Sequence, residues 1–371
     1  MTTPDPLSRY HRQMLVDQIG EAGQQRLAQA TVAIVGVGAL GCATADALAR
    51  GGVGRLILID RDIVERTNLQ RQSLFDERQA LEGLPKAIAA AERLSAINSD
   101  ITVEPHVTDF SAMTAALIDD ADLIIDGLDN FETRYLLNDC AVSRGMPYLY
   151  GGAVGTSGTT MTILPHVGKS ASPPRRITWT TAQATPCLRC LFPEPPPPGS
   201  TPTCDTVGVL ATIIQMTAAR QVTDAIKVLI GAIDELTPAL TTIDAWSGDV
   251  RAMEIASARR DGCPCCGDRQ FDWLTGDRSS AAVTLCGRDA VQVSPPSGDV
   301  PAGTLLEIAG KLDGQGLVSC TDRVLRATLS NELSDQGDPL ELTLFADLRA
   351  IIKGTNQPSR ARAVYARYVG N

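Results

Sequence analysis

The glycine-rich segment GVGALG at residues 36–41 constrains the fold more than any other part of this chain. It lies between an apolar, β-branched run at residues 31–35 and a helical pattern at residues 42–50. Glycines in such a turn let the backbone approach a phosphate, and the N-terminus of the following helix attracts anions. A second apolar run at residues 55–59 ends at Asp60. We therefore expect a right-handed βαβ unit that binds a nucleotide, within a parallel sheet.

The rest of the chain extends this alternation of strands and helices and then departs from it. Further helices and strands are predicted, in chain order, at residues 86–97, 123–126, 131–144, 147–150, 207–230 and 240–244. Between residues 166 and 202, the stretches SASPPRR and FPEPPPPGSTPT are too rich in proline for regular structure. Residues 4–30 are expected to form a helical arm whose apolar face contains Leu7, Tyr10, Met14 and Leu15. The predicted fold class is α/β, a Rossmann-like, doubly wound and mainly parallel sheet.

A change of pattern after the last cysteine cluster divides the chain. We expect a first domain at residues 1–274 and a small C-terminal α+β domain at residues 275–371. In the second domain, strands are predicted near residues 282–285, 325–329 and 340–345, and helices near residues 304–311 and 359–368. Residues 344–355 also have the pattern of two strands around a turn.

The charge and hydropathy of the chain argue against several classes of function. Its formal net charge of -10 disfavours a nucleic-acid or anionic-lipid surface, because both need clustered Lys and Arg. No stretch has the roughly 18 apolar residues of a membrane helix, and the first residues lack an apolar signal-peptide core. We therefore expect a cytoplasmic protein without a membrane or nucleic-acid partner, and a protein partner with a basic face.

Polar residues that follow Asp60 indicate which nucleotide is bound. A carboxylate at the end of the second strand is placed to accept hydrogen bonds from ribose hydroxyl groups. Arg71 and Lys86 can neutralise charge on phosphates, and Asn68 can donate to their oxygens. A nicotinamide site needs less positive charge here, so the pattern favours ATP over a dinucleotide. Two alternatives stay open: an NAD-dependent oxidoreductase, and cations that are merely solvated on the surface.

Six short motifs occur in the order typical of one family. They are RYHRQ at residues 9–13, GVGALG at 36–41, the D-x-D of Asp60 and Asp62, NLQRQ at 68–72, PK at 85–86 and DGLDN at 126–130. In these motifs, over residues 5–268, the chain resembles the ThiF/MoeB/HesA family of adenylyltransferases, which are relatives of ubiquitin-activating enzymes. The resemblance implies an ATP-dependent, Mg²⁺-assisted homodimeric enzyme that forms an acyl-adenylate and pyrophosphate.

The same resemblance implies the residues of the site. The catalytic side chains would be Arg12, Arg71, Lys86 and Asp129. Of these, Arg12 would reach across a dimer interface and Asp129 would orient Mg²⁺. The nucleotide would be bound by a larger set: Gly36, Gly38, Ala39, Gly41, Asp60, Asp62, Asn68, Gln72 and Asn130. Asp129 has an alternative role, because a carboxylate at the start of the next helix can cap it.

Two C-x-x-C pairs, CLRC at residues 187–190 and CPCC at residues 263–266, indicate a metal site. In a chain without a signal peptide, 10 cysteines favour metal binding or thiol chemistry over disulfides. Each pair has the spacing that lets two sulfurs reach one tetrahedral Zn²⁺. Cys265 makes the choice of ligands ambiguous, and the family pattern favours the set Cys187, Cys190, Cys263 and Cys266. A redox-active C-x-x-C is the alternative.

Cys204 differs from the other cysteines. It follows the proline-rich stretch and precedes a helical segment, where family members that form covalent intermediates carry a cysteine. The helix N-terminus would favour its thiolate, and an inert loop thiol is the alternative. The remaining thiols lie in apolar patterns and are expected in the core: Cys42, Cys140, Cys286 and Cys320.

The expected substrate is the C-terminal glycine carboxylate of a ubiquitin-like, β-grasp sulfur-carrier protein that ends in Gly-Gly. The C-terminal segment is too short for a rhodanese domain, so a sulfur donor would act in trans. A rival hypothesis is a thioester between Cys204 and a ubiquitin-like modifier. A scaffold without ATP turnover is another, and the presence of Arg12, Arg71, Lys86 and Asp129 disfavours it.

Overall fold

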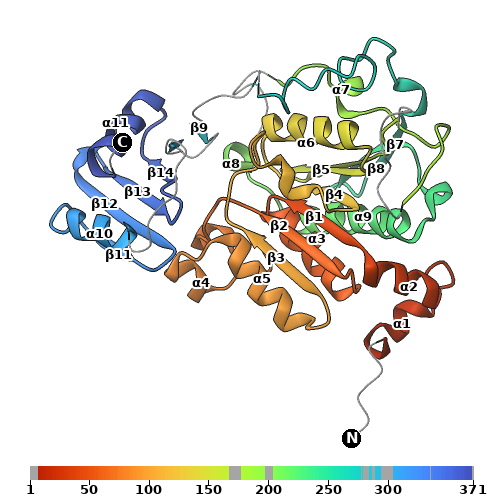
Figure 1. The fold of residues 1–371 in the computed structure, drawn as a ribbon, viewed down its shortest axis with the longest axis horizontal. Helices are drawn as coiled ribbons and strands as arrows, with labels where there is room; N and C mark the ends of the chain where they lie inside the picture. The colour runs from red at the N-terminus through yellow and green to blue at the C-terminus, as the bar shows by residue number, and fades with distance from the viewer. Residues whose placement is uncertain are drawn as a thin grey trace, which may run out of the picture. The chain divides into compact units, whose positions relative to one another are not determined.

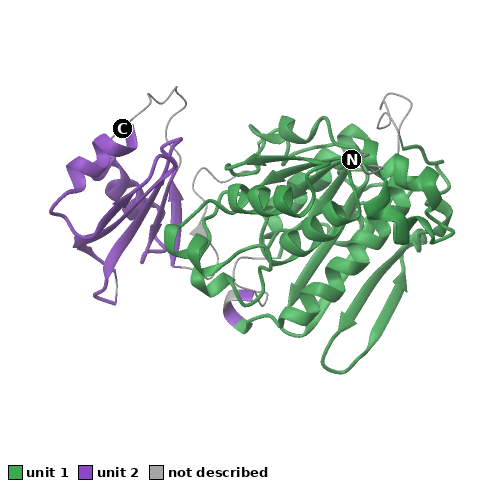
Figure 2. Cartoon of the chain, turned by 90° about the horizontal axis from the view of Figure 1, so that it is seen from below, with its two compact units in different colours: residues 1–197, 207–279 green, residues 198–206, 280–371 purple. Residues whose placement is uncertain are grey.

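The chain forms two compact units in this computed structural model. The structure describes residues 7–166, 177–196, 204–276, 278, 284–285, 289–293, 304–334 and 336–369. One unit comprises Met1–Pro197 and Val207–Ser279, and the other comprises Pro198–Thr206 and Ser280–Asn371 (Figure 2). Cys286, residues 282 and 283 of the strand expected near residues 282–285, and most of the two proline-rich stretches lie outside the described residues.

An eight-stranded sheet forms the centre of the first unit (Figure 1). Its order is β3-β2-β1-β4-β5-β6-β7-β8. The strands are β1 Thr31–Val35, β2 Arg55–Ile59, β3 Thr102–His106, β4 Leu123–Asp126, β5 Tyr148–Val154, β6 Ser157–Ile163, β7 Ala239–Asp244 and β8 Val250–Glu254. From β3 to β5 all neighbours pair in parallel, and β5 to β8 pair antiparallel. The predicted doubly wound, mainly parallel sheet is confirmed.

Helices cover both faces of this sheet, which explains why its central strands are apolar throughout. Val32 and Ile34 of β1 point into a core that also contains residues of α3 Ala39–Arg50, α5 Lys86–Ile97 and α9 Ala211–Ile230. Ala33 and Val35 point to the other side, where α6 Phe131–Arg144 supplies much of the second core. Shorter helices connect these elements: α4 Glu77–Glu82, α7 Leu188–Leu191 and α8 Cys204–Val207.

The glycine turn after β1 makes close backbone contact with the loop that follows β4. Gly36 has a left-handed φ of 87°, which a residue with a side chain rarely adopts. A Cβ atom on Gly41 would lie 1.9 Å from the Gly36 carbonyl oxygen, and one on Gly127 would lie 2.1 Å from that oxygen. Glycine at these positions therefore lets β1, the start of α3 and the loop after β4 meet.

The N-terminal arm differs from its prediction. In place of one helix, residues 7–30 contain a single 3₁₀ turn at Ser8–Tyr10, α1 His11–Met14 and α2 Gly20–Gln29. The chain turns before α2, whose first residue, Gly20, has a left-handed φ of 56°. Of the predicted apolar face, Tyr10 alone is buried, where its hydroxyl accepts a hydrogen bond from Asn98 (2.8 Å), and Leu15 is 68% exposed.

The second unit contains a six-stranded sheet of order β11-β12-β13-β14-β10-β9, in which all neighbours are antiparallel. Its elements are β9 Thr284–Leu285, β10 Ala290–Val293, α10 Thr304–Leu312, β11 Val318–Cys320, β12 Val324–Leu333, β13 Pro339–Phe345, β14 Ala350–Lys353 and α11 Pro358–Tyr368. Apolar residues of α10, α11 and the strands form one core. Among the described residues of both units, no helix is long and apolar enough to span a bilayer.

Candidate functional site

The start of α3 forms an open cradle at the carboxyl edge of the parallel strands. Gly38 is its N-cap, and among the residues that the structure describes, no side chain caps the N-H groups of the first turn. A Cβ atom on Gly38 would have the Gly127 carbonyl oxygen, 3.8 Å away, as its nearest contact, so there is space in front of the turn. Uncapped N-H groups and the helix dipole favour an anion at this place.

Asp60 at the end of β2 connects the glycine turn to the loop that follows. One carboxylate oxygen accepts the Val37 N-H and the other accepts the Asp62 N-H, each at 2.7 Å. Burial raises the pKa of Asp60, and the nearby Lys86 ammonium opposes this shift. Each oxygen retains acceptor capacity, so the carboxylate can also accept ribose hydroxyl groups.

Three of the predicted nucleotide-binding side chains, those of Lys86, Asn68 and Gln72, are buried in the segments that follow β2. Lys86 begins α5 with a side chain that is only 3% exposed, and its Nζ lies 3.1 Å from Asp62 Oδ2. Asn68 is buried and accepts the Glu65 N-H through Oδ1 (3.0 Å). Gln72 is also buried, and its Oε1 has no hydrogen-bond partner within the described part of the chain. A buried cation and an unsatisfied amide oxygen suit a site that is completed by a polar ligand.

Arg71 lies at the α9 side of this site. Its guanidinium donates to the Thr67 carbonyl oxygen (2.8 Å), and its side chain is half-buried. With Leu69, Gln70 and Ser73 it lines a hollow of about 190 Å³, whose opposite wall is the start of α9. The side chains of that wall are Ala211, Thr212 and Gln215.

Asp129 is exposed on the loop after β4, and Asn130 caps the next helix. The Asn130 Oδ1 accepts the Thr133 N-H at 2.9 Å. The alternative role of Asp129 as the cap of α6 is therefore not observed. The side chain of Asn130, which was expected to bind the nucleotide, serves this cap through its oxygen, and the Asp129 side chain is exposed.

A buried ion pair, which no local sequence pattern predicts, fixes the backbone beside Asp129. Asp126 is fully buried and accepts hydrogen bonds from Arg134 Nε (3.2 Å), the Tyr148 hydroxyl (2.8 Å) and the Leu128 N-H (2.9 Å). Arg134 also donates to the Leu128 carbonyl oxygen at 2.7 Å. Both backbone groups of Leu128 are thus held, which limits the positions that Asp129 can take.

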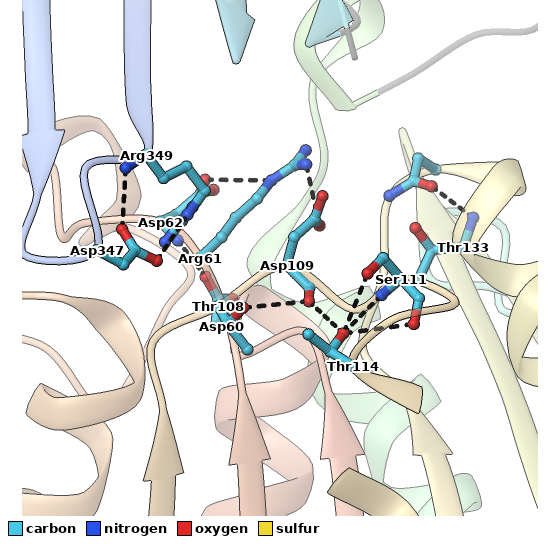
Figure 3. A network of polar contacts seen from close by, with 11 residues as sticks. Asp60, Arg61, Asp62, Thr108, Asp109, Ser111, Thr114, Thr133, Asp347 and Arg349 are labelled. Atoms are coloured by element: carbon cyan, nitrogen blue, oxygen red, sulfur yellow. Dashed lines mark hydrogen bonds and ion pairs between the residues drawn. The ribbon is translucent and has the colours of Figure 1, made fainter. Parts of the chain in front are cut away.

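A second ion-pair network, also missed from the sequence, lies at the ends of β2 and β3. Figure 3 shows Arg61 extending to Asp109, and Arg61 Nη1 lies 3.1 Å from Asp109 Oδ1. The carboxylates that raise the pKa of Arg61 are, in decreasing order, those of Asp109, Asp62, Asp129 and Asp60, although burial alone would lower it. Pairs between residues so distant in sequence leave no local signal.

Arg12 lies away from the cradle of its own chain. It is exposed on α1, and its neighbour Gln13 donates to the carbonyl oxygen of Gly51, the C-cap of α3 (2.9 Å). Because α3 has 12 residues, about 18 Å separates this end from the glycine turn. The structure therefore does not bring Arg12 together with the other site residues of the same chain.

Four buried cysteine sulfurs gather beside α6. The set is Cys187, Cys190, Cys263 and Cys266, and their sulfurs all lie within 4.8 Å of one another. Three of the sulfur pairs are separated by 3.9, 3.6 and 3.4 Å. Sulfurs around a tetrahedral Zn²⁺ with bonds of about 2.3 Å are about 3.8 Å apart, so the arrangement fits this ion.

The helix α6 holds this cluster in place through one amide side chain. Asn138 accepts the Leu188 N-H with Oδ1 (2.8 Å) and donates through Nδ2 to Cys265 Sγ (3.2 Å). Cys265 is not among the four sulfurs that gather, which agrees with the ligand set that the family pattern favours. Cys187 and Cys263 belong to segments 76 residues apart, and their approach joins the loop before α7 to the segment after β8.

The other cysteines differ in burial. Cys42 and Cys140 are fully buried, and burial raises the pKa of each thiol to about 12, so the prediction of core residues is confirmed for both. Cys320 lies on the edge strand β11, where it is partly buried and packs against the core of the second unit, so its predicted core position is confirmed only in part. Cys204 is half-buried in the single turn of α8.

Comparisons with known proteins show which family the chain belongs to. The model of the ThiF family matches residues 10–265. The Sulfur carrier protein ThiS adenylyltransferase of Bacillus subtilis is 40% identical over 363 residues, covering 98% of this chain and 99% of that protein. The Sulfur carrier protein adenylyltransferase of Thermus thermophilus is 36% identical, covering 72% of this chain and 93% of the relative. Crystalline E. coli MccB with succinimide has the same fold, with a TM-score of 0.55, 24% identity and coverage of 72% of this chain and 75% of MccB.

The buried Asp126–Arg134 pair leads to a prediction about stability. We expect Arg134→Ala to lower the free energy of unfolding by about 3 to 5 kcal/mol, because it leaves Asp126 buried without its counter-charge. Tyr148→Phe should lower the free energy of unfolding by a smaller amount, about 1 to 3 kcal/mol, because it removes only the hydrogen bond from the Tyr148 hydroxyl to Asp126. Urea unfolding followed by tryptophan fluorescence measures both.

The control for this comparison is Arg78→Ala on α4, an exposed arginine paired with Glu82, which should change stability by less than about 0.5 kcal/mol. Burial already raises the pKa of Asp126, so protonation favours the folded state, and the loss in Arg134→Ala should shrink as pH falls. Equal losses for Arg134→Ala and Arg78→Ala would contradict a structural role for the pair.

Proposed function

Because the chain belongs to the ThiF family, we propose that it adenylates the C-terminal carboxylate of a ubiquitin-like sulfur-carrier protein, using ATP. The observation that carries this proposal is the joint placement of the open cradle at α3, the carboxylate of Asp60 and the buried ammonium of Lys86. The B. subtilis and T. thermophilus relatives, whose names state this activity, support the choice of substrate. The relative from B. subtilis aligns across both units of this chain.

The reaction needs charge stabilisation more than acid-base chemistry. An oxygen of the carrier's terminal carboxylate attacks the α-phosphorus of ATP. The bond between that phosphorus and the bridging oxygen breaks, and the electron pair leaves with pyrophosphate. No proton has to be transferred, but an anion approaches an anion, so the barrier is electrostatic.

The proposed roles follow from the positions of the side chains. Asp60 binds the ribose, and the N-H groups at the start of α3 face the phosphates. Asn68, Lys86 and Arg71 neutralise or donate to the phosphate oxygens, and Arg71 lies beside the hollow at α9. That hollow of about 190 Å³ is open at the surface, which suits the extended Gly-Gly end of a carrier.

We propose that Asp129 holds Mg²⁺. Its exposed carboxylate is a preferred ligand type for this ion, and the fixed turn around Leu128 sets its position. When bound, Mg²⁺ supplies positive charge to the phosphate oxygens as pyrophosphate leaves.

We propose a homodimer in which Arg12 of one protomer completes the site of its partner. Two observations support this proposal. Arg12 is exposed, and it lies near the end of α3 that is opposite the glycine turn. The net charge of -10 suits a carrier with a basic face. We also propose that the enzyme acts in the cytoplasm. A separate protein would supply the sulfur in trans.

The first test is carrier-dependent exchange of labelled pyrophosphate into ATP. Asp129→Ala and Arg71→Ala should each lower the exchange rate by about 100-fold or more, since both act on charge at the phosphates. Arg78→Ala serves as the matched control and should keep the wild-type rate. Wild-type rates in Asp129→Ala or Arg71→Ala would remove that residue from the site, and no exchange by the wild type with any carrier would refute the function.

The cysteine cluster is proposed as a structural Zn²⁺ site. We expect about one zinc per chain, because the four thiols have the geometry of a closed tetrahedral site. Cys190→Ser should lower both zinc content and melting temperature, whereas Cys320→Ser should change neither. Metal analysis by mass spectrometry measures the zinc. Freshly purified wild-type protein without zinc would rule out the proposal.

Cys204 is proposed as a covalent acceptor of the acyl group. Its sulfur would attack the acyl-adenylate carbonyl carbon, a C-S bond would form, the C-O bond to AMP would break, and AMP would leave with the electron pair. Cys204→Ala should therefore retain pyrophosphate exchange and lose a thiol-sensitive adduct with the carrier on a non-reducing gel. An adduct that persists in this variant would assign the chemistry to another cysteine.

A further inference from the structure

The CPCC segment contributes one cysteine more than a tetrahedral site needs. Cys263 and Cys266 belong to the group of four sulfurs, and Cys265 lies between them in the chain. The side chain of Cys265 is also fully buried. A closed site of four thiolates gives this fifth buried thiol no role.

The turn that carries these three cysteines is compact. The Cys263 carbonyl oxygen accepts the N-H groups of Gly267 and Asp268, each at 2.9 Å. A Cβ atom on Gly267 would lie 2.2 Å from the Asp261 carbonyl oxygen, so a side chain does not fit at this position. The tight turn therefore keeps the cysteine side chains of residues 263–266 close to one another.

Asn138 on α6 holds Cys265 beside the other cysteine pair. One end of the Asn138 carboxamide accepts the Leu188 N-H (2.8 Å), and the other end donates to Cys265 Sγ (3.2 Å). Leu188 directly follows Cys187 in the chain. A single side chain thus connects the backbone next to Cys187 with the sulfur of Cys265.

Among the four cysteines of the group, Cys187 interacts most strongly with Cys265. Hydrogen bonds among the thiols raise the pKa of Cys187, and their contributions decrease in the order Cys190, Cys263, Cys265. For Cys265, the hydrogen bond with Cys187 is the largest influence and lowers its pKa, but burial and Asp139 raise it above the usual value. The Cys265 sulfur is therefore closely associated with the Cys187 sulfur.

We propose that Cys265 is a reserve ligand of the metal site, which replaces Cys187 when that residue cannot serve as a thiolate. The inference rests on the proposed Zn²⁺ site and extends it to a fifth sulfur. In the exchange, the Cys265 thiol loses its proton to the solvent and gives up the hydrogen bond from Asn138. Because Zn²⁺ has no geometric preference from d electrons, a thiolate from a neighbouring position can take the place of another.

The test compares two single variants that each remove one cysteine of the CLRC pair. Cys187→Ser should keep about one zinc per chain, with an affinity lowered about 10- to 100-fold in competition with a chelator, because the replacing sulfur is less well placed. Cys190→Ser should lose the zinc. After exchange of the metal for Co²⁺, Cys187→Ser should show the charge-transfer absorption of four thiolate ligands, as the wild type does.

Two further variants serve as controls. Cys265→Ser should keep the wild-type zinc content and Co²⁺ absorption, because the resting ligands are the other four cysteines. Cys187→Ser combined with Cys265→Ser should lose zinc to the same extent as Cys190→Ser, since three thiolates remain in both proteins. If the single variants are insoluble, they are refolded from urea with added Co²⁺ and compared by the same absorption.

Several results would overturn the inference. One is a loss of metal from Cys187→Ser as complete as that from Cys190→Ser. A second is a double variant that retains as much metal as Cys187→Ser, because the replacing ligand would then be another group. A third is a loss of zinc from Cys265→Ser alone, which would make Cys265 a resting ligand. A wild type without zinc would overturn the metal site together with this inference, whereas pyrophosphate exchange tests the adenylation activity separately.

Discussion

The close backbone contact between the glycine turn and the loop after β4 is the constraint on which the rest of the site depends. The carbonyl oxygen of Gly36 occupies the space that a Cβ atom of Gly41 or Gly127 would need. This contact brings the carboxyl ends of β1 and β4 together with the start of α3. The uncapped N-H groups of α3 and the loop that carries Asp129 therefore lie at the same edge of the sheet, where a ligand in a doubly wound fold binds.

The buried ion pair of Asp126 and Arg134 completes this constraint from the other side. The close contact with Gly36 holds the backbone of Gly127 at the start of the loop. The hydrogen bonds to the N-H and the carbonyl oxygen of Leu128 hold the next residue. The Asp129 side chain is exposed, but the backbone that precedes it is fixed by these hydrogen bonds. A rigid scaffold under an exposed carboxylate reduces the reorganisation needed when charge develops at the site.

Much of the fold could be predicted from the sequence because its signals are local. β1 and β2 have the bounds that the apolar runs indicate, and α9 covers most of its predicted range. The strand β3 was missed because it contains Pro105 and has no buried residue, and β8 was missed because all of its residues are exposed. The pairs Arg61–Asp109 and Asp126–Arg134 were missed because they form only after the strands are placed side by side. The C-x-x-C spacing, in contrast, is a local signal for a cluster that joins distant segments.

The cysteine cluster also sets a topological property of the first unit. A metal ion held by Cys187, Cys190, Cys263 and Cys266 would turn the intervening chain into a closed loop that contains α9, β7 and β8. The entropy of closing a flexible loop rises only with the logarithm of its length, at about 0.6 kcal/mol for each doubling. Related chains can therefore lengthen or shorten the proline-rich stretch within this loop at little thermodynamic cost, which makes it a permissive place for evolutionary insertion while the ends of the loop stay anchored beside α6.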